Sequence, residues 1–206
     1  MRLSVGSFYL PVYMLANLDK YKIVLGSNSP RRKELLAGLG IRFEVKPMPD
    51  IDESYPSSLK ATEIPLYIAK KKAKAYLPTL LPDELLITAD TIVWINDRVL
   101  GKPVDREDAI RILRTLSGHT HEVITGVCLT TQNKSVAFSV KSTVCFASIR
   151  EEDIIYYVDT YHPYDKAGAY GIQEWIGYVA VEAINGSFYN VMGLPIQRVY
   201  QELMKF

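Results

Sequence analysis

The first residues of the chain that could bind an anion together are Ser27, Ser29, Arg31 and Arg32. The apolar residues 23–25 before them predict a buried strand that ends in a tight turn. Ser29 is a good N-cap and a proline follows it, so the two arginines open a helix. The free N–H groups and the dipole at that helix end favour an anion, and arginine binds phosphate through paired hydrogen bonds. An ordinary strand–turn–helix with two solvated arginines explains the local pattern equally well.

The predicted helix should turn one of these arginines inward. A helix advances about 100° per residue, so Arg32 shares an arc with the apolar Leu35, Leu36 and Leu39. We therefore expect its guanidinium to lean over the edge of the sheet instead of pointing into water.

A carboxylate at the end of an apolar strand is the second candidate for chemistry. Residues 85–89 predict a buried strand that delivers Asp90 at or near its end. A carboxylate in such a place is costly unless it is paired or bound to a metal. The alternative is that Asp90 only caps a turn. Lys102, between Gly101 and Pro103, is the cation best placed nearby.

Four lysines occur in the amphipathic helix that is predicted over residues 62–77. Three of them cluster opposite the apolar arc and are explained by solubility. Lys72 instead lies within about 40° of Tyr76 on the helical wheel. It therefore borders the buried face and can reach into a cleft.

Histidines and cysteines are weaker metal candidates. His119 and His121 are two residues apart, so on a strand they share one face and could form a metal pair. No cysteine or third histidine completes a zinc site, and we favour hydrogen-bonding or surface histidines. Cys128 and Cys145 lie in apolar runs without metal spacing, which predicts buried, reduced thiols of an intracellular protein.

Composition limits the classes of partner. The chain of 206 residues has a net charge of +1 and 48% hydrophobic residues, which are ordinary values for a globular protein. No overall field recruits nucleic acid or an acidic membrane, and no apolar run reaches the roughly 18 residues that a membrane span needs. We therefore expect a cytoplasmic protein with local anion sites and without nucleic-acid or membrane partners.

Strands alternate with helices in the first half of the chain, and a long hairpin follows. This order predicts an α/β protein with a mixed, twisted sheet flanked by helices. Residues alternate in polarity over 123–127 and 140–144, so each hairpin strand should show one face to solvent. Beyond the hairpin we expect a helix over 150–161, a strand over 175–183 and a closing helix over 194–206.

Distinctive motifs occur in six segments, residues 23–36, 89–93, 100–103, 117–127, 165–173 and 184–195. Together they resemble the Maf family, the septum-formation-like nucleotide pyrophosphatases, in the family's order and from Tyr21 to the end of the chain. The resemblance implies an elongated, two-lobed α/β fold with a central cleft, shared by Maf and inosine-triphosphatase-like proteins. It assigns residues 21–206 to this domain and leaves residues 1–20 as an N-terminal extension, in which Met14 is an alternative start.

The resemblance implies an enzyme that hydrolyses nucleoside triphosphates, with dTTP and UTP favoured, to the monophosphate and pyrophosphate, and so clears non-standard or excess pyrimidine nucleotides. In it, Asp90 acts as general base, and Glu53 joins Asp90 in holding Mg²⁺ or Mn²⁺. Without the resemblance, the acidic loop around Glu53 is explained as merely solvated. The family often forms dimers, which makes a homodimer a candidate assembly. The residues that the resemblance places against the substrate are Ser27, Arg31, Arg32, Lys72, Thr91, Lys102 and Gln173.

Gln173 decides the expected substrate. In the family, the Gly-Ile-Gln ending found here accompanies thymidine- and uridine-triphosphate pyrophosphatases, whereas the branch acting on 7-methyl-GTP typically has an acidic residue. A glutamine amide offers one donor and one acceptor, which match O4 and N3–H of thymine or uracil. The alternative is that Gln173 satisfies backbone groups of its own turn. Arg31 and Thr91 match positions that track the same preference.

A rival interpretation is a nucleotide-binding regulator of septum formation or cell division with little turnover. The same cations would serve such a protein. The presence of both Glu53 and Asp90 favours the enzyme, because binding a triphosphate needs only the cations.

Overall fold

Three long strands, β3 (Glu84–Ile95), β5 (Thr120–Thr130) and β6 (Ser135–Phe146), run through both halves of the molecule. The computed structural model describes residues 13–47 and 51–206, and within them the sheet has seven strands in the order β2-β1-β3-β5-β6-β7, with β4 pairing β3. β1 is parallel to β2 and β3, and the other pairs are antiparallel. The predicted mixed sheet is therefore confirmed. The shorter strands are β1 (Lys22–Gly26), β2 (Phe43–Lys46), β4 (Arg98–Leu100) and β7 (Val181–Asn185).

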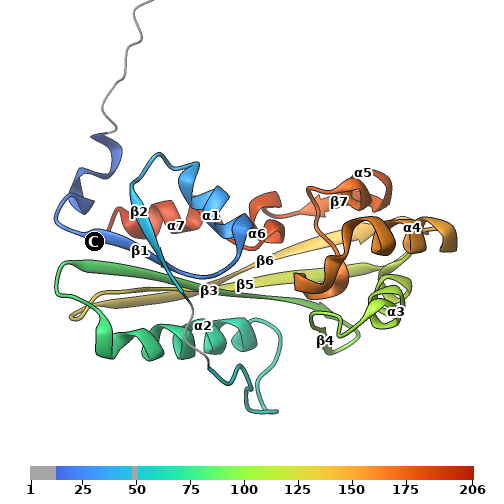
Figure 1. Ribbon diagram of the computed structural model, residues 1–206, viewed down its shortest axis with the longest axis horizontal. Helices are drawn as coiled ribbons and strands as arrows, with labels where there is room; N and C mark the ends of the chain where they lie inside the picture. Colours follow the sequence, from blue (N-terminus) through green and yellow to red (C-terminus); the bar gives the residue numbers. More distant parts are fainter. Residues whose placement is uncertain (1–12, 48–50) are drawn as a thin grey trace, which may run out of the picture.

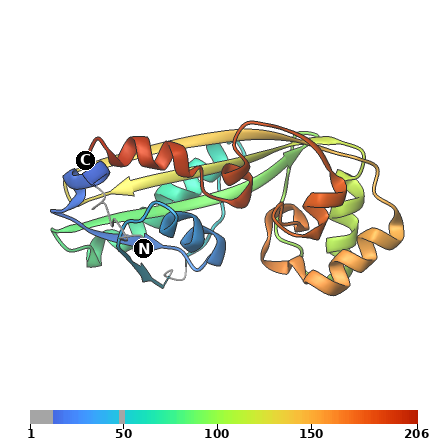
Figure 2. The same cartoon turned by 90° about the horizontal axis from the view of Figure 1, so that it is seen from above.

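Helices cover both faces of the sheet and gather at one of its ends (Figure 1). α2 lies along one face, α1, α6 and α7 lie along the other, and α3, α4 and α5 surround one end of the long strands. Seen from above, the molecule has two lobes joined by the long strands (Figure 2). One lobe holds α1, α2, α6 and α7, and the other holds α3, α4 and α5. This is the elongated, two-lobed shape that the resemblance implies. The helices are α1 (Pro30–Ala37), α2 (Glu63–Tyr76), α3 (Arg106–Leu116), α4 (Glu151–Tyr161), α5 (Trp175–Ala180), α6 (Phe188–Met192) and α7 (Ile196–Leu203), with short 3-10 turns η1 (Tyr13–Leu18), η2 (Leu77–Thr79), η3 (Pro163–Asp165) and η4 (Ala167–Ala169).

Side chains along β3 alternate between the two faces of the sheet. Leu85 and Ile87 belong to the main core, whereas Leu86 packs in a separate cluster with residues of α2. The same alternation turns Asp90 toward α2 and Thr91 toward α1. Two polar residues that are adjacent in sequence therefore serve opposite faces of one strand.

The prediction that each hairpin strand shows one face to solvent is wrong for β5, in which only Thr120 is exposed. α2 packs on β5 from one face and α6 from the other. The polar residues of the pattern find partners inside the protein. Thr125 Oγ1 donates to the carbonyl of Asn190 at 3.2 Å, and Ser142 Oγ donates to the carbonyl of Ser187 at 3.1 Å. A buried and hydrogen-bonded polar residue thus gives the same sequence pattern as a solvent-facing one.

The strand predicted over residues 175–183 is wrong in its first part, which forms α5 before β7 begins. Ile176 and Ala180 are four residues apart and both buried, which is the spacing of one helical face. Gly177 lets α5 begin directly against the preceding turn, since a Cβ there would lie 1.8 Å from the carbonyl oxygen of Ile172. Tertiary packing overrides the strand preference of these aromatic and β-branched residues.

The described part of the predicted N-terminal extension packs against the C-terminal end of the chain. Leu15 and Leu18 of η1 are 5% and 6% exposed and belong to the main core. Asn17 Nδ2 donates to the carbonyl of Leu203 at 2.9 Å. Residues 1–12 of the predicted extension lie outside the described residues. Within the described part of the chain, no helix is long and apolar enough to cross a membrane.

These contacts predict where the chain can be shortened. A chain that begins at Met14 keeps both buried leucines and should melt at the same temperature as the full chain. A chain that begins at Tyr21 loses them, at a cost of about 2–3 kcal/mol per leucine, and should melt about 10 °C lower or more. Scanning calorimetry of the three chains measures the difference. Equal melting temperatures for the two shortened chains would contradict the packing of η1.

Candidate active site

One edge of β3 is only partly paired. On this edge the register with β1 ends at Ile87 and the register with β4 begins at Val93. Among the described residues, 88–92 therefore have no strand beside them on that edge, while the other edge pairs with β5 without interruption. The gap opens into a cavity of about 320 Å³ that residues from both lobes line. Of the predicted site residues, those in its wall are Arg31, Arg32, Glu53, Lys72, Asp90, Thr91, Lys102 and Gln173.

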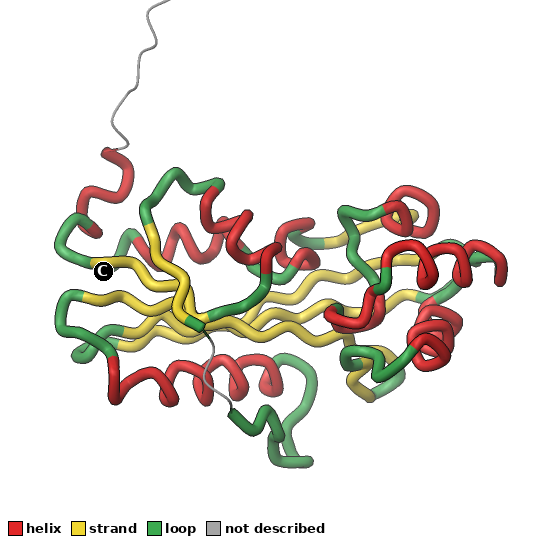
Figure 3. The backbone as a smooth tube through the Cα atoms, in the orientation of Figure 1, coloured by secondary structure: helices red, strands yellow, loops and turns green. Residues whose placement is uncertain are grey.

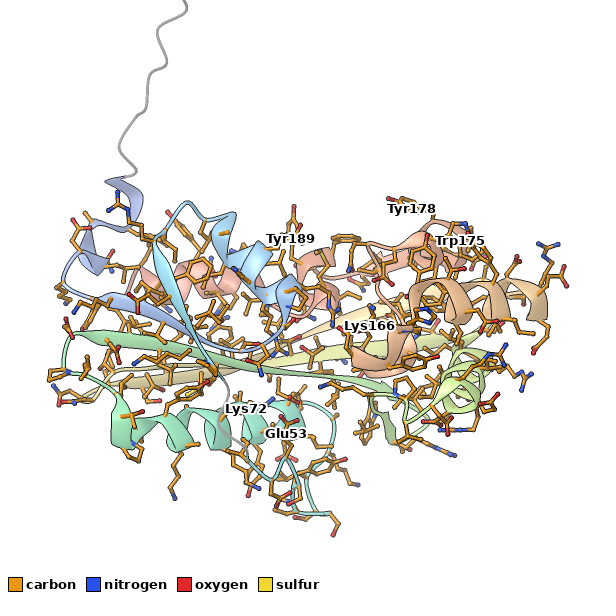
Figure 4. All side chains as sticks on the ribbon, viewed as in Figure 1. Glu53, Lys72, Lys166, Trp175, Tyr178 and Tyr189 are labelled. Atoms are coloured by element: carbon orange, nitrogen blue, oxygen red, sulfur yellow. The ribbon has the colours of Figure 1, made fainter. Side chains whose placement is uncertain are left out.

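Lys72 joins the two predicted acidic residues. Its ammonium lies 2.8 Å from Oδ1 of Asp90 and 2.9 Å from Oε1 of Glu53, and its side chain is only 6% exposed. Figure 4 shows Glu53 and Lys72 side by side on the α2 side of the sheet. The two carboxylates offset the cost of burying the ammonium. The Lys72 ammonium is therefore a positive charge that both carboxylates contact in the wall of the cavity.

Lys72 reaches this point because α2 approaches the sheet unusually closely. α2 crosses β5 at Gly126, where a Cβ would lie 2.3 Å from the carbonyl oxygen of Pro65. Only glycine fits at that crossing. Thr88, two residues before Asp90, donates from Oγ1 to the carbonyl of Ala69 at 2.8 Å and ties α2 to β3.

The loop that carries Glu53 is held against α2, beneath the sheet in Figure 3. Asp52 accepts a hydrogen bond from the backbone N–H of Ser54 at 2.8 Å. Lys71 Nζ lies 3.3 Å from the Asp52 carboxylate and donates to the Ser54 carbonyl at 3.2 Å. Hydrogen bonds from Ser54 and Lys71 lower the pKa of Asp52 to about 2. Lys71, which the sequence explains by solubility, thus anchors the loop.

Arg32 leans over the edge of β3, as its place on the helix predicts. Its Nε donates to the carbonyl of Gly193 at 2.9 Å, and Nη1 donates to the carbonyl of Ala89 at 2.8 Å and to Ser27 Oγ at 3.3 Å. Nη2 donates to Thr91 Oγ1 at 3.1 Å. Four of the five N–H groups of the guanidinium are therefore committed to the protein. Burial lowers the pKa of Arg32.

Ser27 is the predicted site residue that the structure sets behind the cavity wall. It is only 4% exposed, and its hydroxyl accepts from the backbone N–H of Ser29 at 3.2 Å as well as from Arg32. Ser29 lines the cavity in its place. Both serines follow β1, and their spacing alone does not show which one faces inward.

Arg31 connects the two lobes across the cavity. Its Nη1 lies 2.9 Å from Oδ2 of Asp165. Lys166, only 7% exposed, lies 3.0 Å from Oδ1 of Asp165 and 3.2 Å from Oε1 of Glu174. Burial raises the pKa of Asp165, but hydrogen bonds from Lys166 and Arg31 outweigh it and hold that pKa below its usual range.

Asp165 and Lys166 line the cavity, yet the sequence predicts only Gln173 from their motif. Two features could have singled them out. They are an oppositely charged pair adjacent in sequence, and they directly precede a glycine-rich turn. Figure 4 shows Lys166 in the lobe opposite α1 and α2.

Two polar groups in the cavity wall, the ammonium of Lys102 and Oε1 of Gln173, have no hydrogen-bond partner among the described residues. Lys102 is exposed on the rim of the cavity and forms no hydrogen bond or ion pair with the described residues. Oε1 of Gln173 is buried and has no hydrogen-bond donor among them. A buried acceptor without a donor costs about 1–3 kcal/mol. The arrangement therefore favours a ligand that donates a hydrogen bond at this point.

The two histidines do not form a metal pair. Nε2 of His121 lies 2.8 Å from the hydroxyl of Tyr170, and burial lowers the pKa of His121 to about 4, so the ring is neutral near pH 7. His119 is exposed, and no group of three or more His, Cys, Asp or Glu side chains in the described residues could hold a metal. Cys128 is buried as predicted, but Cys145 is only half-buried beside a carboxylate.

Comparisons with known proteins point to one family. A family model described as Maf-like protein matches residues 22–206. The chain is 67% identical over 193 residues to a dTTP/UTP pyrophosphatase of Parabacteroides distasonis, covering 94% of this chain and 100% of that protein. It is 63% identical over 190 residues to a dTTP/UTP pyrophosphatase of Bacteroides fragilis, covering 92% and 98%. Among solved structures, that of a HAM1 protein from Coxiella burnetii has a TM-score of 0.49 at 17% identity, covering 90% of this chain and 100% of that one.

The arginine and lysine contacts predict different outcomes for alanine variants. Lys102→Ala should weaken binding of inorganic tripolyphosphate roughly 10-fold but change stability by less than about 0.5 kcal/mol. Arg32→Ala removes the guanidinium donors from the carbonyls of Ala89 and Gly193 and should lower the free energy of unfolding by about 2–3 kcal/mol. Titration calorimetry and thermal melts measure both effects. Lys33→Ala, an exposed site outside the cavity wall, is the matched control. Equal tripolyphosphate binding by Lys102→Ala and Lys33→Ala would remove Lys102 from the anion site.

Proposed function

The chain belongs to the family of Maf-like proteins, and we propose that it is a metal-dependent pyrophosphatase that hydrolyses dTTP and UTP to the monophosphate and pyrophosphate. The observation that carries this proposal is the pair of carboxylates, Asp90 and Glu53, that both contact the Lys72 ammonium in the wall of a cavity. Four further cations, Arg31, Arg32, Lys102 and Lys166, line the same cavity. Relatives with 60–67% identity that bear the name dTTP/UTP pyrophosphatase support the same choice of substrate.

Asp90 is the general base of the proposed reaction. Asp90 belongs to the stretch of β3 that has no described strand beside it on one edge, and it lines the cavity. A water molecule attacks the α-phosphorus and gives its proton to Asp90. The new O–P bond forms as the bond from the α-phosphorus to the bridging oxygen breaks, and that oxygen leaves with pyrophosphate.

Asp90 and Glu53 fit a divalent cation. Both offer the oxygen ligands that Mg²⁺ and Mn²⁺ prefer, and the ammonium of Lys72 already marks the point between them as one where positive charge is stable. A divalent cation bound there supplies Lewis-acid chemistry and lowers the pKa of a bound water. Lys72, with its flexible stem, can then pair with a phosphate oxygen instead.

The remaining cations bind the phosphate chain. Lys102 brings a positive charge that no carboxylate of the described residues neutralises. Arg31 can exchange its contact with Asp165 for a phosphate oxygen, because its fork suits either anion. Arg32 keeps one N–H for substrate, while its other contacts hold the start of α1 against β3.

Gln173 reads the base. Its buried Oε1 accepts the N3–H of thymine or uracil, and its NH₂ group donates to O4. Thr91, the other proposed specificity residue, acts by holding Arg32 through its hydroxyl at 3.1 Å.

Pyrophosphate release tests the proposed function. The protein should release pyrophosphate from dTTP and UTP faster than from 7-methyl-GTP, and EDTA should abolish the release. Asp90→Asn keeps the shape but loses the base, and should lower turnover by roughly 10²-fold or more. Asp97→Asn, in the exposed turn after β3, is the matched control and should retain full activity. Near-normal hydrolysis by folded Asp90→Asn protein would remove Asp90 from the reaction.

A further inference from the structure

Gln173 sits in a tight turn whose two ends are bonded to each other. The backbone N–H of Glu174 donates to the carbonyl of Gly171 at 2.9 Å, which leaves Gln173 as the third residue of a four-residue turn. The direction of the Gln173 side chain therefore depends on what holds residues 171 and 174.

One hydroxyl, that of Tyr157 in α4, holds both ends of this turn. Tyr157 is fully buried, and its oxygen accepts a hydrogen bond from the backbone N–H of Gly171 at 3.0 Å while it donates to Oε2 of Glu174. Burial and the neighbouring Glu174 carboxylate raise the pKa of Tyr157 far above its usual range. The hydroxyl is therefore a permanent donor to Glu174.

The carboxylate of Glu174 lies directly over the backbone of the turn. A Cβ on Gly171 would lie 2.8 Å from Cδ of Glu174, so the glycine leaves just the space that this carboxylate occupies. On the other side, α5 approaches the turn at Gly177. A Cβ on Gly177 would lie 1.8 Å from the carbonyl oxygen of Ile172. The turn therefore contacts both α4 and α5, and we call the hydrogen bonds of Tyr157 to Gly171 and Glu174 the clamp.

The clamp is continuous with the phosphate end of the cavity. Oε1 of Glu174 is 3.2 Å from Lys166, which is 3.0 Å from Asp165, which in turn is 2.9 Å from Arg31. An unbroken series of charged contacts therefore runs from the arginine that opens α1 to the turn that carries Gln173.

We infer that Tyr157 and Glu174 are positioning residues for base recognition, because they hold the turn that places Gln173, with its unpartnered Oε1, in the wall of the cavity. This inference rests on the proposed base-reading function of Gln173. Neither side chain is needed for the chemical step. Loss of the clamp should therefore raise KM for substrates whose base Gln173 reads and leave kcat nearly unchanged.

The test is a double-mutant cycle with Tyr157→Phe, Gln173→Leu and the combined variant, assayed with dTTP and with base-free 2-deoxyribose 5-triphosphate. Tyr157→Phe should lower kcat/KM for dTTP roughly 10-fold, through KM, and leave the base-free substrate unchanged. The combined variant should be no worse on dTTP than Gln173→Leu, because both changes remove one interaction. Tyr156→Phe, an exposed hydroxyl on the same helix, is the control and should match the unmodified protein.

Three results would overturn the inference: additive losses in the combined variant, equal losses on both substrates, or wild-type kinetics in Tyr157→Phe. If Tyr157→Phe fails to fold, Glu174→Gln, which keeps the size but loses the charge, must show the same dTTP-selective rise in KM. The proposed function is judged separately, by whether the unmodified protein hydrolyses dTTP. If it does and Gln173→Leu loses nothing, the inference about the clamp fails while the hydrolase stands.

Discussion

The contact of the Lys72 ammonium with Asp90 and Glu53 sets the geometry around it. A buried ammonium is costly without a partner, and this one has two, at 2.8 and 2.9 Å. Meeting them requires α2 to lie almost against β5, which Gly126 permits, and requires the loop after β2 to fold back onto α2. The sheet, the helix and the loop therefore converge where β3 has lost its strand neighbour.

The opposite face of β3 is organised by a second cation with another function. Arg32 uses most of its donors on backbone carbonyls and on Thr91, so it seals the free edge of β3 between β1 and β4. Arg31, one residue earlier, is free to face the other lobe and contacts Asp165. The two adjacent arginines thus have different roles. Arg32 stabilises the free edge of β3, and Arg31 lines the cavity and contacts the other lobe. Beyond Asp165, Lys166 and Glu174 carry the contacts on to the turn that holds Gln173.

The sequence pattern within one helix or strand predicts the direction of side chains on that element. It turns Arg32 over the sheet, places Lys72 at the border of a buried face and delivers Asp90 from a buried strand. Contacts between distant segments leave no such local pattern. The bonds of Lys166 to Asp165 and Glu174 arise from a turn and a helix start that fold together. Similarly, the aromatic and β-branched run after residue 174 looks like a strand. Its close approach to Ile172 and the burial of Ile176 and Ala180 on one side accompany a helix instead.

Hydrolysis of dTTP in water enriched in ¹⁸O tests most directly whether water attacks the α-phosphorus in this cavity. The ¹⁸O should appear in dTMP and be absent from the released pyrophosphate, because the bond to the bridging oxygen breaks on the α side. Mass spectrometry of the two products after one round of hydrolysis distinguishes them. Label in pyrophosphate, or release of labelled inorganic phosphate with dTDP, would contradict the proposed reaction, since either places the attack on the β- or γ-phosphorus.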